Sequence, residues 1–321
     1  MKKLITILAL ICIVFIFYPS NNFLKISDKF SIEKIKDQVR QELNRYNAKK
    51  ANNQHKDLIN EAEIAKAASS KVTDELPKDA ISVSTVAAFQ AAVKSSYMQM
   101  NDEVKINYVG KAWLTEDNTP FKLVEKTVKY DNSSDYKSVY FRYLINEYNV
   151  NTISYNDSPK VVVTIKFKYK TTQAQYQQVD MAVTQVLQSI INPNMSVDDK
   201  ITEINDFIVR NVAYDTTLQK RSDYDALFGE KSAVCEGYAL LVQLMLTKAG
   251  IPSHIVTGVA KTPHAWNIVK FSDGWYHLDA TWNDPVPDQG NNVSHMYLKR
   301  TSDSLKKEGR TWEIDRFSFA K

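Results

Sequence analysis

Cys235 lies in the stretch Ser232-Ala233-Val234-Cys235-Glu236-Gly237-Tyr238 and is the only cysteine outside the apolar N-terminal segment. Apolar residues then recur at helical spacing until Gly250, which predicts a helix with Cys235 at or just before its N-terminus. Unpaired backbone N–H groups and the positive end of the helix dipole favour the nucleophilic thiolate there. The alternative is a small buried residue, because free cysteines are often buried.

Two later stretches supply a histidine and an aspartate. Pro263-His264-Ala265-Trp266-Asn267 opens an alternating apolar pattern, and Trp275-Tyr276-His277-Leu278-Asp279 follows it. Asp273-Gly274 between them is a strong signal for a two-residue hairpin turn, so we expect His264 and Asp279 on neighbouring strands. A cysteine at a helix tip with a histidine and an aspartate on adjacent strands is the arrangement of a nucleophile, a base and an orienting group.

In the expected hairpin register, His264 and Asp279 do not lie opposite each other. A turn centred on Asp273-Gly274 pairs Asp279 with Ile268 and places His264 on the same face. His264 then lies about 13 Å further along, at ~3.4 Å per residue. A bulge, a strong twist, or a position of His264 in the loop before its strand would have to close this gap.

These motifs resemble the transglutaminase-like superfamily, whose fold is related to papain-type cysteine proteases. The matching stretches lie roughly between residues 196 and 300: Val234-Cys235-Glu236-Gly237-Tyr238-Ala239, Ala249-Gly250-Ile251-Pro252, His264-Ala265-Trp266-Asn267 and Trp275-Tyr276-His277-Leu278-Asp279-Ala280-Thr281-Trp282. The resemblance implies an α+β protein with a papain-like, transglutaminase-like catalytic domain over residues 193–321. Asn205 departs from the family pattern, in which a histidine often precedes the aspartate at this point.

The resemblance also implies the chemistry. Cys235 attacks a carboxamide carbon, His264 protonates the departing amine, and Asp279 holds the imidazole in the useful tautomer. Release of the thioester to water or to a second amine leaves two outcomes open: a transglutaminase-like acyltransferase, or a cysteine peptidase or amidase. Trp266 is a candidate substrate-binding residue or a core aromatic, and His277 is either an alternative base or a structural histidine.

The expected partner is a protein or peptide substrate, for example a cell-wall peptide. The backbone N–H of Cys235 is the expected oxyanion donor, with a second donor that the sequence does not identify. The alternative from another functional class is a catalytically silent module that binds cell-wall material or partner proteins.

Composition narrows the remaining classes. The 321 residues carry a net charge of +4, and 44% of them are hydrophobic, as in an ordinary globular protein. No block of like charge is typical of a nucleic-acid arm, so no nucleic-acid partner is expected. Two cysteines, Cys12 and Cys235, exclude a disulfide framework and a thiolate-rich zinc site. His277 and Asp279 offer two ligands from one strand face without a third, so neither a metal nor a cofactor is expected.

The N-terminal part is expected to direct the chain out of the cytoplasm. Residues 1–22 predict a signal or membrane anchor, with Lys2 and Lys3 before the apolar run Leu4 to Tyr18. An uncleaved anchor is favoured, because Tyr18-Pro19-Ser20 shows no small-residue cleavage site; a cleaved signal would give a secreted protein. Residues 23–80 predict a helical stalk and linker.

Residues 81–192 predict a smaller, accessory α+β domain. Its expected elements are a helix over 86–97, strands over 104–109 and 121–130, a helix capped by Ser134, and strands over 148–155 and 161–169. Thr172-Gln173-Ala174-Gln175 is a capping box for a helix that ends near Ile190, and Ser196 caps the next helix. After Asp279, residues 283–290 form a loop, over the active site or on the surface, and edge strands are expected over 295–298 and 312–319.

Overall fold

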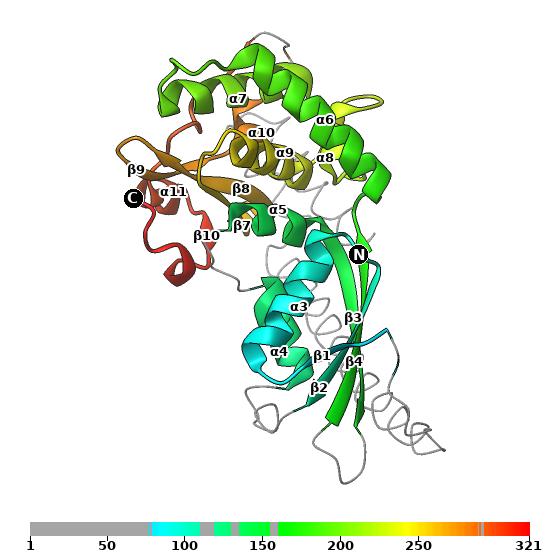
Figure 1. Cartoon of the computed structure of the whole chain (residues 1–321). Coiled ribbons are helices and arrows are strands. Elements are labelled where there is room, and N and C mark those ends of the chain that lie inside the picture. Colours follow the sequence, from blue (N-terminus) through cyan, green and yellow to red (C-terminus); the bar gives the residue numbers. More distant parts are fainter. Residues whose placement is uncertain are drawn as a thin grey trace, which may run out of the picture. The chain divides into compact units, whose positions relative to one another are not determined.

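The computed structural model describes residues 77, 79–109, 119–129, 135–154, 160–287, 289 and 292–321. Leu76–Lys321 forms one compact unit of mixed helices and sheets, which confirms the predicted α+β class (Figure 1). The predicted anchor, residues 1–22, lies outside the described residues, as does nearly all of the predicted stalk. No helix in the described part of the chain is long and apolar enough to cross a membrane. The boundary between residues 192 and 193 stays a prediction.

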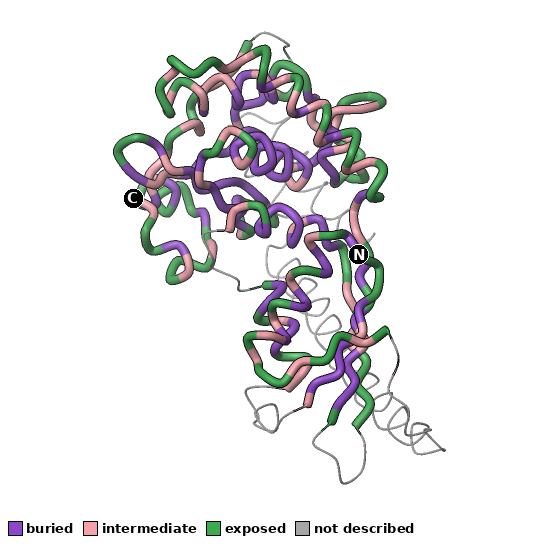
Figure 2. Tube along the Cα trace, in the orientation of Figure 1, coloured by how far each residue is buried: buried purple, intermediate pink, exposed green. Residues whose placement is uncertain are grey.

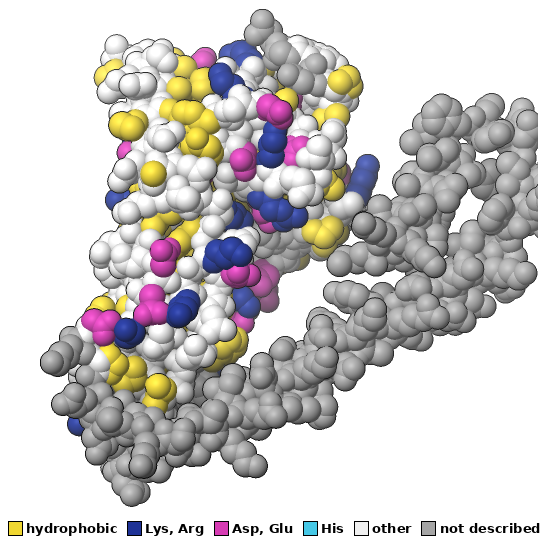
Figure 3. Space-filling view, turned by 90° about the vertical axis from the view of Figure 1, so that its right-hand side faces the viewer, with side chains coloured by type: hydrophobic (Ala, Val, Ile, Leu, Met, Phe, Trp, Pro, Cys, Tyr) yellow, Lys and Arg dark blue, Asp and Glu magenta, His cyan; other side chains and the backbone are white. Residues whose placement is uncertain are grey.

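The accessory part contains a four-stranded sheet in the order β1 (Ile81–Val83), β2 (Glu103–Val109), β4 (Lys160–Tyr169), β3 (Ile145–Ser154). Its core combines Phe89, Val93 and Tyr97 of α3 (Val86–Met98) with alternate residues of β2 and β4. On the other face of β4, Lys166 pairs with Glu103 and Lys168 with Glu147. Lys166 and Lys168 are therefore solvated partners of carboxylates. Figure 3 shows basic and acidic side chains interspersed on one face of the molecule.

The strand predicted over residues 121–130 is wrong, because this segment is the helix α4 (Pro120–Lys129). Its buried residues are Leu123, Val124, Thr127 and Val128, which recur at the spacing of one helical face. Phe121, which the alternating strand pattern would bury, is exposed. The next helix, α5 (Tyr136–Leu144), is capped by Asp135 rather than by Ser134.

Helix α9 (Cys235–Lys248) occupies the centre of the remaining part (Figure 1). It contacts α5, α6 (Gln173–Ile190), α7 (Val197–Asn211), the short α8 (Asp223–Leu227), and the strands β7 (Ser253–Ala260) and β8 (Thr262–Phe271). Every residue from Gly237 to Leu246 is buried (Figure 2). The predicted caps hold: Thr172 and Gln175 form the capping box of α6, and Ser196 caps α7.

The second sheet has the order β10 (Thr311–Trp312), β7, β8, β9 (Gly274–Leu278). Phe271 pairs with Gly274, so the hairpin turn is Ser272-Asp273 and the predicted register is wrong by two residues. Asp279, just past the end of β9, therefore lies opposite Trp266 rather than Ile268. His264 lies within β8, paired with Gly258, and not in the preceding loop. The remaining offset is two residues, about 7 Å at ~3.4 Å per residue.

The chain after Asp279 contributes little strand. Ala280–Asn283 is the short helix α10, residues 296–298 form a turn instead of the predicted edge strand, and Arg300 makes an isolated bridge to His277. After α11 (Ser302–Lys307), the tail adds only β10 before a 3-10 turn at Asp315–Phe317. The tail thus closes one edge of the second sheet, beside β7.

Candidate active site

Cys235 is the first residue of α9 and is half-buried. The strand β6 (Ser232–Ala233) leads into it and pairs with β5 (Ala213–Tyr214), which sets Tyr214 opposite Ala233. Burial raises the pKa of the Tyr214 phenol, and the negative charges of Cys235 and Asp215 add to the effect. Tyr214, which the sequence did not single out, is therefore a neighbour of the thiol.

Gly237 allows the first turn of α9 to sit against the chain before it. A Cβ atom at this position would lie 2.6 Å from Cβ of Ala233 and 2.7 Å from the carbonyl oxygen of Ser222. Both distances are shorter than a carbon atom tolerates, so only glycine fits between β6 and the N-cap of α8. The glycine two residues after Cys235 thus fixes where the helix tip begins.

His264 connects the other two candidate residues. Its Nε2 lies 2.8 Å from Oδ2 of Asp279. The ring is also close enough to Cys235 for that side chain to affect its pKa, and Nδ1 is the ring nitrogen that Asp279 leaves available for the thiol. The side chain is only 7% exposed. Burial lowers the pKa of His264, but the hydrogen bonds to Asp279 and Cys235, with the negative charges of both, outweigh burial and raise it to about 9. The imidazole is therefore protonated at neutral pH.

Asp279 is buried and makes contacts in three directions. As the N-cap of α10, its Oδ1 accepts a hydrogen bond from the backbone N–H of Trp282 at 3.2 Å. Its Oδ2 accepts from His264 and also from Nη1 of Arg310, at 2.6 Å. The N-cap turn brings the carboxylate back toward β8, which closes the offset that the strand register leaves.

Arg310 is the site residue that sequence reasoning missed. Its side chain is 1% exposed, and its guanidinium lies over the rings of Trp282 at 4.1 Å, Tyr297 at 4.9 Å and Trp266 at 5.4 Å. Nε and Nη2 of Arg310 have no hydrogen-bond partner among the described residues. No local pattern marks this position, because an arginine after a Glu-Gly pair at a helix end is typical of a solvated turn.

His277, the alternative base, has both ring nitrogens engaged elsewhere. Nδ1 accepts a hydrogen bond from Nε1 of Trp266 at 2.8 Å, and Nε2 lies 3.1 Å from Oγ of Ser302. Burial, with the charges of Arg310 and Lys306, lowers its pKa to about 3. Trp266 is 1% exposed in the second apolar cluster, so it packs in the core and does not line an open surface for substrate.

Asn205, the departure from the family pattern, bridges two helices. It is fully buried, and its Oδ1 accepts a 2.9 Å hydrogen bond from Nδ2 of Asn283 at the end of α10. The neighbouring Asp206 lies 2.6 Å from Nε2 of the half-exposed His295. An amide at position 205 therefore ties α7 to the helix that Asp279 caps.

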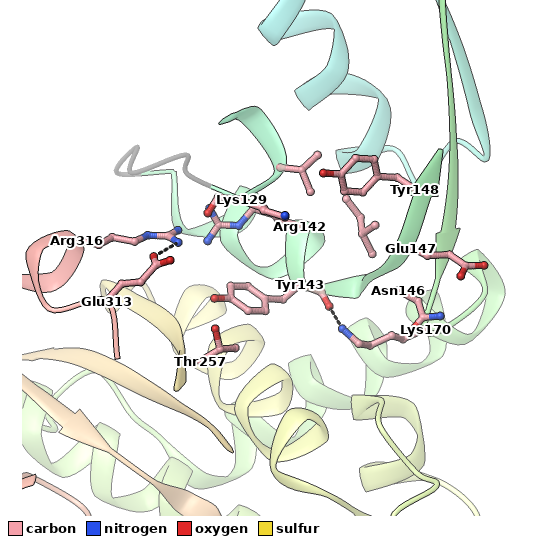
Figure 4. Close-up of a pocket in the computed structure, with 12 residues that line it drawn as sticks. Lys129, Arg142, Tyr143, Asn146, Glu147, Tyr148, Lys170, Thr257, Glu313 and Arg316 are labelled. Carbon is pink, nitrogen blue, oxygen red and sulfur yellow. Dashed lines mark hydrogen bonds and ion pairs between the residues drawn. The ribbon is translucent and has the colours of Figure 1, made fainter. Parts of the chain in front are cut away.

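A cavity of about 510 Å³ lies away from these residues (Figure 4). Four of its lining side chains are cations and two are carboxylates, and Glu313 lies 3.6 Å from Arg316 across its edge. The lining residues are Val128, Lys129, Arg142, Tyr143, Ile145, Asn146, Glu147, Tyr148, Lys170, Thr257, Glu313 and Arg316. Within the described residues, no group of three or more His, Cys, Asp or Glu side chains could hold a metal ion.

Residues 184–280 match the sequence model of the transglutaminase-like superfamily. This segment is a transglutaminase-like domain. The match includes Cys235, His264 and Asp279 and ends before Arg310. No curated protein matches the chain.

Solved structures with similarity to the chain share low sequence identity with it. One, described as a TGase, is 14% identical, with a TM-score of 0.32 over 58% of this chain and 53% of that one. A candidate cysteine protease from Cytophaga hutchinsonii is 17% identical, with a TM-score of 0.29 over 45% and 68%. The periplasmic domain of TgpA from Pseudomonas aeruginosa, bound to ethylmercury, is 16% identical, with a TM-score of 0.28 over 40% and 59%. The match thus spans about half the length of the first of these chains.

Proposed function

We propose that the protein is a thiol enzyme that acts on carboxamide or peptide bonds through a thioester, with Cys235 as nucleophile, His264 as acid and base, and Asp279 as orienting group. One observation carries the proposal: a single imidazole hydrogen-bonds to Asp279, and its interactions with Asp279 and Cys235 raise its pKa to about 9. A histidine that is protonated at neutral pH beside a thiol at a helix N-terminus favours the thiolate form.

In the first half-reaction, the sulfur of Cys235 forms a bond to the carbonyl carbon of the substrate. The carbon–nitrogen bond then breaks, and the departing amine takes the proton from Nδ1 of His264. The backbone N–H groups at the start of α9, which have no partner within the helix, are the proposed donors for the oxyanion. Asp279 keeps Nε2 protonated, so the exchangeable proton stays on the nitrogen that faces the sulfur.

In the second half-reaction, the now neutral imidazole accepts a proton from water or from a second amine. The resulting nucleophile attacks the thioester, the carbon–sulfur bond breaks, and the thiolate of Cys235 is restored. Attack by water makes the enzyme a peptidase or amidase, and attack by an amine makes it a crosslinking acyltransferase. Both outcomes use the same three side chains.

The proposed setting is the cell surface, with cell-surface or cell-wall proteins and peptides as substrates. The support for this is the sequence of residues 1–22, in which two lysines precede an apolar run. In this proposal the run Leu4 to Tyr18 holds the chain in the membrane and the transglutaminase-like domain lies outside the cytoplasm. Membrane fractionation tests it: a soluble product that begins near Asn21 would contradict the anchor.

The test of activity incubates the full chain with a glutamine-containing peptide, in the presence and absence of a fluorescent primary amine. Amine incorporation identifies acyl transfer, ammonia release without incorporation identifies deamidation, and shortened peptides identify a peptidase. Cys235→Ala is the control and should abolish all three. If the folded wild type has none of these activities and Cys235 resists alkylation at pH 7, the protein is a binding module and the proposal is wrong.

A further inference from the structure

We infer that Arg310 is a positioning residue that holds down the proton affinity of His264 through the carboxylate they share, so that the imidazole can release its proton within each catalytic cycle. The inference rests on the proposed function. It adds a residue that lies outside the segment matched by the family and that no sequence motif indicated.

The geometry makes the guanidinium a direct competitor of the imidazole. Nη1 of Arg310 and Nε2 of His264 lie 2.6 Å and 2.8 Å from the same oxygen, Oδ2 of Asp279. Both cations therefore draw on one negative charge, in a place where the side chains of Arg310 and Asp279 are 1% and 3% exposed. Water screens such buried charges only weakly.

The guanidinium of Arg310 has few polar contacts besides the one with Asp279. Two of its nitrogens, Nε and Nη2, have no hydrogen-bond partner among the described residues, and three aromatic rings surround the guanidinium. Aromatic faces attract a cation, but they carry no net negative charge that would neutralise it. Asp279 is thus the only ionic partner of this buried charge within the described part of the chain.

The sign of the effect follows from these contacts. Asp279 and Cys235 both raise the pKa of His264, because each stabilises the imidazolium. A permanent cation on the same oxygen opposes this, since it repels the imidazolium and neutralises part of the carboxylate charge. Without Arg310, the imidazolium would be the only partner left on Oδ2. The pKa of His264 would rise further, and the neutral base needed for the second half-reaction would become scarce.

The experiment titrates the imidazole of His264 by NMR in a Cys235→Ala background, which removes the thiolate contribution and requires no activity. The His264 resonance is assigned by its loss in His264→Gln. Two neutral variants, Arg310→Gln and Arg310→Met, are compared with this parent, and near-UV circular dichroism verifies folding. Having two neutral side chains of different polarity keeps the test open if one variant does not fold, and His264 remains as a cation for Asp279 in both.

Arg300→Gln is the matched control. Arg300 also lies in the C-terminal part and stacks on Tyr297, at 5.3 Å, but its guanidinium pairs with Glu308 instead of Asp279. We expect the pKa of His264 to rise by about one unit or more in either Arg310 variant and to stay unchanged in the control. In the active background, breakdown of the thioester at pH 7.5 should slow about tenfold for each unit, with a smaller effect on its formation.

A folded Arg310 variant in which His264 titrates as in the parent would overturn the inference. So would equal shifts in Arg310→Gln and Arg300→Gln, which would indicate a general change in the tail. Failure of the proposed function has a different signature: the pKa shift would be present, while the wild type turns over no amide substrate.

Discussion

Tyr140 of α5 donates a 2.6 Å hydrogen bond to Oδ2 of Asp223, the first residue of α8. Both side chains are buried, and the bond joins the accessory part to a helix that packs on α9. Burial raises the pKa of Asp223 to about 6, although the hydrogen bond from Tyr140 opposes that shift. Above pH 6 the protein therefore keeps a buried carboxylate whose only side-chain hydrogen bond among the described residues comes from a phenol.

The raised pKa of Asp223 predicts that the free energy of unfolding falls as the pH rises from about 4 to 6. The folded state binds a proton at Asp223 that the unfolded chain, with an ordinary pKa near ~3.9, has already lost. We expect Asp223→Asn to flatten this part of the curve and to stabilise the protein at pH 7, on the order of 1–3 kcal/mol. Urea unfolding from pH 4 to 7 measures it; a variant with the wild-type slope would contradict the assignment.

The raised pKa of His264 predicts a second dependence of stability on pH, at higher pH values. Its stabilising contribution is complete below the unfolded pKa of ~6.5 and disappears as the pH passes through the folded value of about 9. We expect wild-type stability to drop by on the order of 3 kcal/mol across this interval. His264→Gln should remove most of that drop, and thermal unfolding from pH 6 to 10 provides the comparison.

Alkylation of Cys235 should depend on His264 and not on His277. We expect the folded wild type to react rapidly with iodoacetamide at pH 6, where an ordinary thiol, titrating near ~8.5, is largely unreactive. His264→Ala should slow the reaction at pH 6 about tenfold or more, because the imidazolium that stabilises the thiolate is lost. His277→Gln should leave the rate close to wild type, since the His277 ring bonds to Trp266 and Ser302.

Asp279→Asn separates nucleophile formation from turnover. The amide still occupies the N-cap of α10 but no longer fixes the tautomer of the imidazole, so we expect alkylation to persist while turnover falls by several orders of magnitude. Single-turnover kinetics on an amide substrate, beside the alkylation rate, make the distinction. Equal losses in both would show that Asp279 serves the thiol directly.

Gly237→Ala should damage the site without touching a reacting group. The new methyl group would collide with Cβ of Ala233 and with the backbone of Ser222, so the first turn of α9 must shift. We expect a loss of about 1–3 kcal/mol in the free energy of unfolding and slower alkylation of Cys235 in the folded protein. Chemical denaturation and alkylation kinetics on the same variant test both; wild-type values in each would show that the turn adapts.

Truncation should distinguish the two ends of the N-terminal half. A chain that lacks residues 1–80 is expected to fold with its site intact. Removal of residues 81–190 as well should abolish cooperative unfolding, because it deletes Tyr140 and Tyr143, whose hydroxyls donate to Asp223 and to the backbone oxygen of Ile255. Equally cooperative thermal unfolding of both truncations would contradict this dependence.

Local sequence patterns predicted much of the fold. The capping box at Thr172, the cap at Ser196 and the helix after Cys235 each depend on residues within a few positions of one another, and each is present in the structure. Residues 121–130 show where such patterns fail: Phe121 and Leu123 fit a strand, whereas Leu123 and Thr127 fit a helix. Only packing against α3 and β3 decides between the two.

The candidate site was predictable as far as motifs reach. The Cys, His and Asp motifs placed three residues near one another, although the hairpin turn was set one residue too late along the chain and the register two residues off. Arg310 was beyond reach because its contact with Asp279 depends on the path of the C-terminal tail. That path is determined by the pairing of β10 with β7 and by three aromatic rings brought in from distant positions.

The tail also bears on how this protein could be divided or recombined. The stretch that matches the family model ends at residue 280, yet the carboxylate of Asp279 is contacted from residue 310. A fragment trimmed to the matched stretch would contain Cys235, His264 and Asp279 but lack Arg310, which binds the carboxylate of Asp279. Chimeras with proteins that contain a transglutaminase-like domain should therefore exchange the matched segment and its C-terminal tail together.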